Sequence, residues 1–314
     1  MKIDKKDKIL IAGGNGMLGK AINKILHKKG YKRILSPSRN ELDFKKIKKL
    51  DKYFKKNNPQ YIIMCAAKVG GILDNSSKKL AYLEENLEIQ DNFFKIIKKY
   101  KIKKSVFISS SCIYPKLSPQ PINEKSFLSG KLEETNEGFA LAKIIGIKKA
   151  EYYFKEYGLL TICPVICNLY GPNDNYDLDT SHVFAALIKK FLQAIKNKDG
   201  KVILWGTGKP IREFMYVEDA ARAVVFLFEN YNSTEIINVG TGVSLSIKSL
   251  SKKIALECNF IGRIIWDNTK SDGMMKKCLN ISKLSKLKYR SKISIESGIK
   301  KTIYDFKKNN DLAL

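Results

Sequence analysis

The chain has 314 residues and 44% hydrophobic content, which is enough to bury the core of one large domain or of two closely joined domains. No run approaches the roughly eighteen apolar residues of a membrane span, which excludes a membrane protein of that kind. The formal net charge is +27, but the excess is lysine scattered through every segment, typical of an AT-rich genome, so we expect no nucleic-acid partner.

Six cysteines without a C-x-x-C pair are expected to be free thiols, and with only two histidines we expect no metal site. The N-terminal segment 1–7 is charged and runs directly into an apolar strand. Because it has no apolar signal region, we expect the protein in the cytoplasm.

The first half of the chain alternates short apolar runs with longer amphipathic stretches, which is typical of βαβ units in a parallel sheet. Strands are expected at about 8–12, 32–36, 60–65, 104–110 and 160–167. Helices are expected at about 19–29, 80–100 and 138–157.

A glycine-rich turn follows the first expected strand and opens the first helix. Its glycines are Gly13, Gly16 and Gly19, and the residues between them include Asn15, Met17 and Leu18. Glycine lets a pyrophosphate approach the backbone at a helix N-terminus, where free N–H groups favour anions. In this βαβ position the turn predicts a dinucleotide site; the alternative is an ordinary tight turn.

The end of the second expected strand carries Ser36, Ser38 and Arg39 instead of the acidic residue that binds a ribose 2′-hydroxyl in NAD sites. An arginine and two hydroxyls suit a 2′-phosphate. The sequence therefore predicts NADP(H) as cofactor, unless Arg39 is only an exposed surface charge.

From Gly171 the sequence becomes rich in loops. We expect helices at about 183–196 and 217–229, strands at 202–205 and 235–239, and alternating short elements in the last seventy residues. The predicted fold is α/β: a Rossmann-type, doubly wound parallel sheet with a smaller, interleaved C-terminal lobe. The dinucleotide-binding domain would consist of residues 1–170 and a returning segment at about 201–245. The substrate lobe would consist of residues 171–200 and 246–314.

Several further motifs carry a family resemblance over nearly the whole chain. They are Ser111-Cys112-Ile113-Tyr114-Pro115-Lys116, Asn168-Leu169-Tyr170-Gly171-Pro172, Ser181-His182-Val183, Trp205-Gly206-Thr207-Gly208, Arg212-Glu213-Phe214 and Asn238-Val239-Gly240-Thr241-Gly242. Together with the glycine turn and the segment from Cys65 to Gly71, they resemble the extended short-chain dehydrogenase/reductase superfamily and, within it, the GDP-L-fucose synthase family.

The resemblance implies NADPH-dependent C4 reduction of a GDP-4-keto-6-deoxy sugar. In the superfamily a serine polarises the ketone, a tyrosine donates the proton and a lysine holds the cofactor ribose. Ser110 and Lys143 match the serine and lysine, and Ala66 matches a cofactor contact. The tyrosine position holds Phe139.

Loss of the tyrosine hydroxyl should cost roughly 3–5 kcal/mol of barrier lowering, since a general acid contributes about 10²–10⁴ in rate. Phenylalanine still fills the ring position, so we expect fold and cofactor binding to survive. Phe139 is either an introduced Tyr→Phe change or a natural departure in which water, Ser110 or another group delivers the proton.

The family also epimerises C3 and C5 of the ketosugar, and Cys112 and His182 match its acid and base residues. For the nucleotide sugar, the resemblance implies Arg212 at the diphosphate, Lys190 and Trp205 nearby, and Asn168 close to the reacting sugar. The alternatives are a buried structural cysteine, a histidine at a helix start and an exposed lysine.

Relatives of this kind pair through two long helices, so we expect a homodimer built on 80–100 and 138–157. Two other functions stay open. One is a pure C4 reductase of a GDP-6-deoxy-4-keto-heptose, and the other is a non-catalytic nucleotide-sugar binding protein, which Phe139 would permit.

Overall fold

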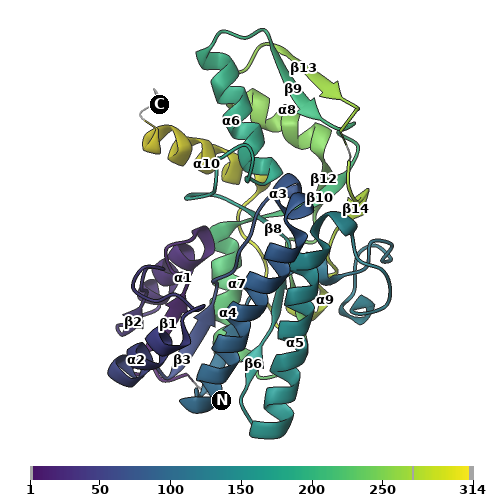
Figure 1. Ribbon diagram of the computed structural model, residues 1–314. Helices are drawn as coiled ribbons and strands as arrows, with labels where there is room; N and C mark the ends of the chain where they lie inside the picture. Colours follow the sequence, from purple (N-terminus) through teal and green to yellow (C-terminus); the bar gives the residue numbers. More distant parts are fainter. Residues whose placement is uncertain (1–2, 271, 311–314) are drawn as a thin grey trace.

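A parallel sheet forms the centre of the first half of the chain in the computed structural model, which describes residues 3–270 and 272–310 (Figure 1). Its strand order is β2-β1-β3-β4-β6, and every neighbouring pair is parallel. The strands are β1 (Ile9–Ala12), β2 (Ile34–Leu35), β3 (Tyr61–Met64), β4 (Lys104–Phe107) and β6 (Thr161–Ile162). The order reverses at β1, so its carboxyl end is where a doubly wound sheet binds its ligand.

Helices cover both faces of this sheet. Helix α1 (Met17–Lys28) packs against α7 (Val217–Asn230) on one face; on the other, α4 (Lys79–Lys99) packs against α2 (Ile47–Asn57) and α5 (Glu137–Tyr157). In α1 the buried side chains Ile22, Ile25 and Leu26 recur at helical spacing, which is why that face turns to the sheet. Burial on both faces explains why β1 and β3 are apolar at every position.

The remaining strands form three smaller sheets. A parallel sheet has the order β11-β7-β5, with β5 at Ser109–Ser110, β7 at Pro164–Ile166 and β11 at Ile237–Val239. Strand β10 (Ile211–Tyr216) pairs with β8 (Asn168–Tyr170), β12 (Ser244–Ser246) and β14 (Lys276–Lys277). Strands β9 (Lys201–Trp205) and β13 (Arg263–Asp267) pair with each other.

A second hydrophobic core lies in the upper lobe of Figure 1, where α6 (Val183–Lys196), α8 (Ile247–Glu257) and α10 (Ile295–Asn309) gather around Phe184 and Phe191. Val202 and Leu204 of β9 belong to this core, whereas α7 and β11 belong to the first. We therefore propose that the segment returning to the dinucleotide domain begins at α7 and not at residue 201. The ends of the predicted domains, 1–2 and 311–314, lie outside the described residues.

Short helices complete the chain. They are α3 (Ile72–Ser77), α9 (Ser282–Lys286) and the 3₁₀ turns η1 (Ser111–Ile113), η2 (Glu124–Ser126) and η3 (Glu134–Asn136). Within the described residues, none of the helices combines the length and apolar character needed to cross a membrane. The cysteines are unpaired, and five of the six are buried.

The predicted α/β class and its parallel sheet are confirmed, and three details differ. Helix α2 was not predicted, because its lysine-rich sequence buries only Leu50 and Phe54. Strand β10 and helix α3 were also missed. The strands expected at 104–110 and 160–167 are each divided in two, at Ile108 and at Cys163.

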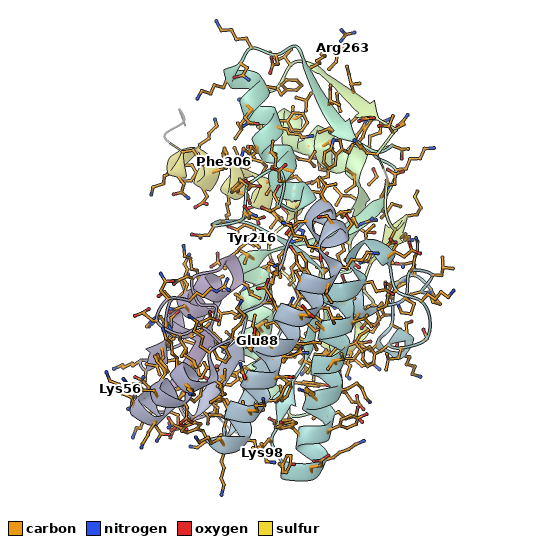
Figure 2. The ribbon with its side chains drawn as sticks, in the orientation of Figure 1. Lys56, Glu88, Lys98, Tyr216, Arg263 and Phe306 are labelled. Atoms are coloured by element: carbon orange, nitrogen blue, oxygen red, sulfur yellow. The ribbon has the colours of Figure 1, made fainter. Side chains whose placement is uncertain are left out.

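Basic side chains are spread over the surface of both lobes. Figure 2 shows Lys56 and Lys98 at the end of the first lobe and Arg263 at the opposite end of the molecule. Several lysines are engaged by acidic neighbours, for example Lys29 by Glu229 at 2.5 Å and Lys103 by Asp7 at 2.6 Å. This distribution agrees with a general positive charge and does not single out one basic face.

Candidate active site

The glycine turn connects β1 to α1 at the carboxyl edge of the sheet. Gly13 has a φ of +76°, and a Cβ there would stand 2.8 Å from the backbone nitrogen of Ala66. A Cβ on Gly19 would stand 2.2 Å from the carbonyl oxygen of Gly13. Because a Cβ would clash at both positions, both must be glycine. Ala66 packs against the turn, and the surface of the turn consists of backbone atoms.

Helix α1 begins after Gly16 without a side-chain cap, and Asn15 at the turn is exposed. Its first residues, Met17 and Leu18, therefore present N–H groups at the positive end of the helix dipole. This donor set fits the pyrophosphate of a dinucleotide cofactor.

Arg39 lies beyond β2 and is exposed, with its Nε 3.9 Å from a carboxylate oxygen of Asp43. Such a distant, solvent-exposed pair holds the side chain weakly. Ser36 lies beside the turn, since a Cβ on Gly14 would overlap its hydroxyl oxygen. The guanidinium is therefore free to turn toward a phosphate on the adenosine ribose.

Ser110 and Cys112 meet at the end of β5. The hydroxyl oxygen of Ser110 accepts a hydrogen bond from the Cys112 backbone nitrogen at 3.5 Å and so caps the turn η1. Cys112 is buried, and burial raises the pKa of its thiol, while the ammonium groups of Lys277 and Lys143 oppose that shift. Burial is the larger effect, so the pKa of the thiol stays above its ordinary value while the two cations limit the rise.

Lys143 lies on α5, where its Nζ donates a hydrogen bond of 2.9 Å to the carbonyl oxygen of Ile108. That carbonyl is free to accept because the strand breaks between β4 and β5. The ammonium lies 4.7 Å from the centre of the Phe107 ring and 5.5 Å from that of Phe139. Burial lowers the pKa of Lys143 to about 8.

His182 stands immediately before α6. Its loop packs against the segment after β3: Gly71 donates its backbone N–H to the Thr180 carbonyl at 2.8 Å, and a Cβ on Gly71 would stand 2.4 Å from the Ser181 carbonyl oxygen. The imidazole keeps solvent access while protein atoms surround it, and the resulting desolvation lowers its pKa. A histidine in this state can accept a proton near neutral pH.

Three strands bring polar side chains to the opposite side of the site. Asn168 on β8 donates through Nδ2 to the carbonyl oxygen of Glu213 at 2.9 Å. Arg212 on β10 is in register with Lys277 on β14. Burial lowers the pKa of Lys277 and of Arg212, and the neighbouring charge of Arg212 lowers that of Lys277 further.

Lys277 was not predicted from the sequence. A lysine pair in a chain with so many lysines carries no signal, and Lys277 comes near Cys112 and Arg212 only through the strand register. Two cations on neighbouring strands repel each other, so this pair favours an anion between them.

Lys190 and Trp205 form a separate pair in the upper lobe. The Lys190 ammonium donates to the Ile203 carbonyl at 3.0 Å and lies 5.3 Å from the centre of the Trp205 ring. Trp205 is 46% exposed, and the ammonium of Lys270 lies 5.9 Å from the centre of the same ring. The structure thus brings these two predicted residues together, at the end of β9.

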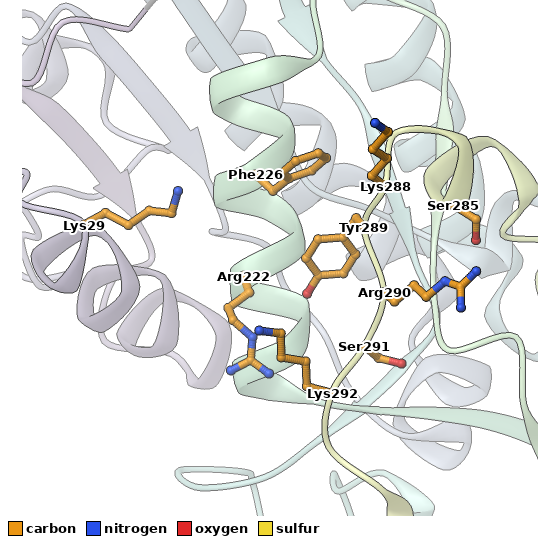
Figure 3. Close-up of a pocket in the computed structure, with 9 residues that line it drawn as sticks. All are labelled: Lys29, Arg222, Phe226, Ser285, Lys288, Tyr289, Arg290, Ser291 and Lys292. Carbon is orange, nitrogen blue, oxygen red and sulfur yellow. The ribbon is translucent and has the colours of Figure 1, made fainter.

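A hollow of about 570 Å³ lies away from these residues, between α7 and the segment after α9 (Figure 3). Arg222 and Lys292 lie together beside Tyr289, whereas Arg290 and Lys288 point elsewhere. Arg222 is held by the buried carboxylate of Asp219. The cationic side chains therefore do not point toward a common position within the hollow. The hollow is separate from the candidate active site.

Comparison with known proteins adds to this geometry. The model of the NAD dependent epimerase/dehydratase family matches residues 9–240. GDP-L-fucose synthase 1 of Arabidopsis thaliana is 40% identical over 303 residues, covering 96% of this chain and 94% of the relative. The chain belongs to this family, in its GDP-L-fucose synthase group. The predicted family resemblance is therefore confirmed.

Solved structures of family members share the fold over their whole length. A GDP-L-fucose synthetase of Naegleria fowleri bound to NADP has a TM-score of 0.92 at 28% identity, covering 100% of this chain and 96% of that one. A GDP-6-OMe-4-keto-L-xylo-heptose reductase of C. jejuni has a TM-score of 0.91 at 29% identity, covering 99% and 100%. The N. fowleri structure holds NADP, and the glycine turn described above fits a dinucleotide of this kind.

Proposed function

We propose that this chain is an NADPH-dependent C4 reductase of a GDP-4-keto-6-deoxy sugar with the capacity to epimerise C3 and C5. The observation that carries the proposal is the meeting of Ser110, Cys112 and Lys143 beside the glycine turn, opposite the Arg212 and Lys277 pair. The names of the relatives supply the class of sugar nucleotide.

The cofactor would be held by backbone N–H groups of the glycine turn at its pyrophosphate, by Arg39 at its 2′-phosphate and by Lys143 at its ribose. When bound, NADPH supplies the hydride. Arg212 and Lys277 hold the substrate diphosphate, and the Trp205 indole, with Lys190 beside it, offers a face to the guanine base.

At the ketone, the Ser110 hydroxyl donates a hydrogen bond to the C4 oxygen. Because Phe139 has no hydroxyl, the proton for that oxygen must come from another group. Lys143 can supply it, since one of its three N–H donors is held by Ile108 and its pKa of about 8 matches an acid working near neutral pH. A water molecule in the space of the absent hydroxyl would carry the proton.

Epimerisation would use the other two titratable groups. The ketone acidifies the C–H bonds at C3 and C5, so a base can remove a proton from one face of the sugar while an acid delivers a proton to the other face. Cys112 and His182 supply these two roles, one in its deprotonated form and the other in its protonated form. This step does not need the missing tyrosine.

A heptose is the second candidate substrate. The C. jejuni heptose reductase, at 29% identity, is as similar to this chain as the N. fowleri GDP-L-fucose synthetase, at 28%, and this supports the heptose as an alternative. A pure C4 reductase of that kind would leave the protons at C3 and C5 in place.

We also propose a homodimer formed through α4 and α5. The exposed face of α5 carries Leu141 (38% exposed), Ile145 (37%) and Tyr152 (48%), an apolar stripe that a second copy would cover. Static light scattering should give twice the chain mass, and a monomeric mass would overturn this arrangement. Location in the cytoplasm stays a prediction.

The test of function is incubation with NADPH and GDP-4-keto-6-deoxy-mannose in deuterated water, followed by mass spectrometry and NMR of the sugar. Deuterium at C3 or C5 together with NADPH oxidation supports the bifunctional reaction. NADPH oxidation without deuterium supports the pure reductase. Binding of GDP and NADPH with neither reaction would identify the non-catalytic binding protein.

A further inference from the structure

A buried carboxylate stands directly behind the proposed diphosphate site. Glu213 is 1% exposed and follows Arg212 on β10. Because side chains alternate along a strand, Glu213 points to the face opposite Arg212. It does not contact the proposed ligand itself.

The Glu213 carboxylate is satisfied by backbone donors from two different segments. One oxygen accepts from the backbone nitrogens of Thr241 at 2.6 Å and Gly242 at 2.7 Å, and the other accepts from that of Leu279 at 2.8 Å. Within the part of the chain that the structure describes, no lysine or arginine forms an ion pair with it. Burial raises its pKa while these N–H donors oppose that shift.

These donors lie at the two neighbours of β10. Thr241 and Gly242 lead into β12, which pairs with β10 on one side, and Leu279 follows β14, which pairs on the other. One carboxylate therefore ties both flanking strands to the strand that carries Arg212. The backbone carbonyl oxygen of Glu213 also accepts a hydrogen bond from the side-chain amide of Asn168.

The hydrogen bond from Leu279 to Glu213 matters most for β14. This strand has only two residues, Lys276 and Lys277, and pairs with β10 at two positions. Arg212 and Lys277 repel each other, and the carboxylate of Glu133, which acts on both cations, offsets this repulsion only in part. The bond from Leu279 to Glu213 offsets that repulsion from the back of the sheet.

We propose that Glu213 is a positioning residue that sets the separation of Arg212 and Lys277 and thereby the affinity for a nucleoside diphosphate. This inference rests on the proposed function of the Arg212 and Lys277 pair. The Glu213→Gln substitution removes the charge and keeps the shape of the side chain. Its amide N–H₂ then faces a backbone N–H donor, so the hydrogen bonds to at least one of the two flanking segments are weakened.

The experiment measures GDP binding by calorimetry and NADPH binding by fluorescence on the full chain and on Glu213→Gln. We expect GDP to bind about tenfold more weakly and the NADPH Kd to change less than about twofold, at a temperature where circular dichroism shows both proteins folded. An unchanged GDP Kd overturns the proposal, as does an equal loss for both ligands. If Glu213→Gln does not fold, Glu213→Asp, which keeps the charge but shortens the reach, is measured in the same way.

Asp219 provides a matched control. Its carboxylate is also fully buried and accepts backbone N–H bonds, from Lys292 at 3.0 Å and Ile293 at 2.7 Å, but it lies on α7, away from the diphosphate site. Asp219→Asn should lower stability and leave GDP binding within about twofold. If it weakens GDP binding as much as Glu213→Gln does, the effect is general loosening and the proposal fails.

A double-mutant cycle with Arg212→Ala separates the positioning role from the proposed function. If Glu213 acts through Arg212 and Lys277, its substitution should add less than about twofold in the Arg212→Ala background. Full additivity contradicts the positioning role. If the unaltered chain does not bind GDP at all, the proposed function fails first.

Discussion

The ammonium nitrogen of Lys143 lies 5.5 Å from the centre of the Phe139 ring, one turn further along α5. The ring can stabilise the cation by its face but cannot exchange a proton with it. We therefore propose that the lysine itself, and not the aromatic ring, exchanges the proton at the ketone.

The first prediction is a pH profile. As the acid, Lys143 must be protonated, and burial lowers its pKa to about 8. The rate of NADPH oxidation in a single turnover should therefore fall about tenfold for each pH unit above about 8. A rate that stays level up to about pH 10 would assign the proton to a different group. Lys143→Met should remove the reaction, and Lys155→Met, at an exposed lysine on the same helix, serves as the control.

Arg39 should decide between the two nicotinamide cofactors. Arg39→Ala removes a cation from a 2′-phosphate, and a hydrogen bond to a charged group contributes roughly 1.5–3 kcal/mol, so NADPH should bind about tenfold or more weakly. NADH binding, which lacks that phosphate, should change little. Fluorescence titration with both cofactors measures this. Arg33→Ala, another exposed arginine near β2, is the control, and an equal loss of both cofactors would speak against the assignment.

Arg212 and Lys277 should control the sugar nucleotide and not the cofactor. Arg212→Ala and Lys277→Met should each raise the KM for the substrate by about tenfold to a hundredfold, because each removes a charged hydrogen-bond donor from a diphosphate. Steady-state kinetics at saturating NADPH checks this, with the exposed neighbour Lys276→Met as the matched variant. Should Lys276→Met have the same effect, the general charge of the chain is responsible.

Lys104 should give the fold a pH dependence of its own. It is fully buried on β4 and donates to the Phe228 carbonyl at 2.6 Å and to the Asn232 side-chain oxygen at 2.9 Å, and burial lowers its pKa to about 8. The unfolded chain, with a lysine pKa of about 10.4, binds more protons between these values, so stability rises with pH in this window.

Urea denaturation of the chain and of Lys104→Met tests that sign. From about pH 7.5 to about pH 9.5 the unaltered chain should gain roughly 2 kcal/mol in unfolding free energy relative to the variant. A constant difference between the two proteins across this range would show that Lys104 keeps its proton in the fold as it does in the unfolded chain, and would contradict the lowered pKa.

The parts of the site that the sequence predicts are those with a local signal. The glycine turn is recognisable because the three glycines and their flanking strand and helix are adjacent in the chain. Ser110 and Lys143 are recognisable by their motifs. In the structure Ser110 caps the turn after β5, and Lys143 donates to the Ile108 carbonyl.

The parts that could not be predicted depend on contacts between distant segments. Lys277 reaches Arg212 through the register of β10 with β14, and the Glu213 carboxylate joins residues from 241 to 279. The Ile108 carbonyl accepts Lys143 only because a strand breaks there. In a lysine-rich sequence, neither periodicity nor composition distinguishes a lysine of the site, such as Lys277, from a lysine on the surface.

The central claim is that Phe139 removes the proton donor and leaves the rest of an active reductase in place. The measurement is the rate of NADPH oxidation with GDP-4-keto-6-deoxy-mannose for this chain and for Phe139→Tyr, with the Kd of NADPH and of GDP for each. The account predicts a rate increase of roughly 10²- to 10⁴-fold with both Kd values unchanged. An equal rate in the two proteins would contradict it.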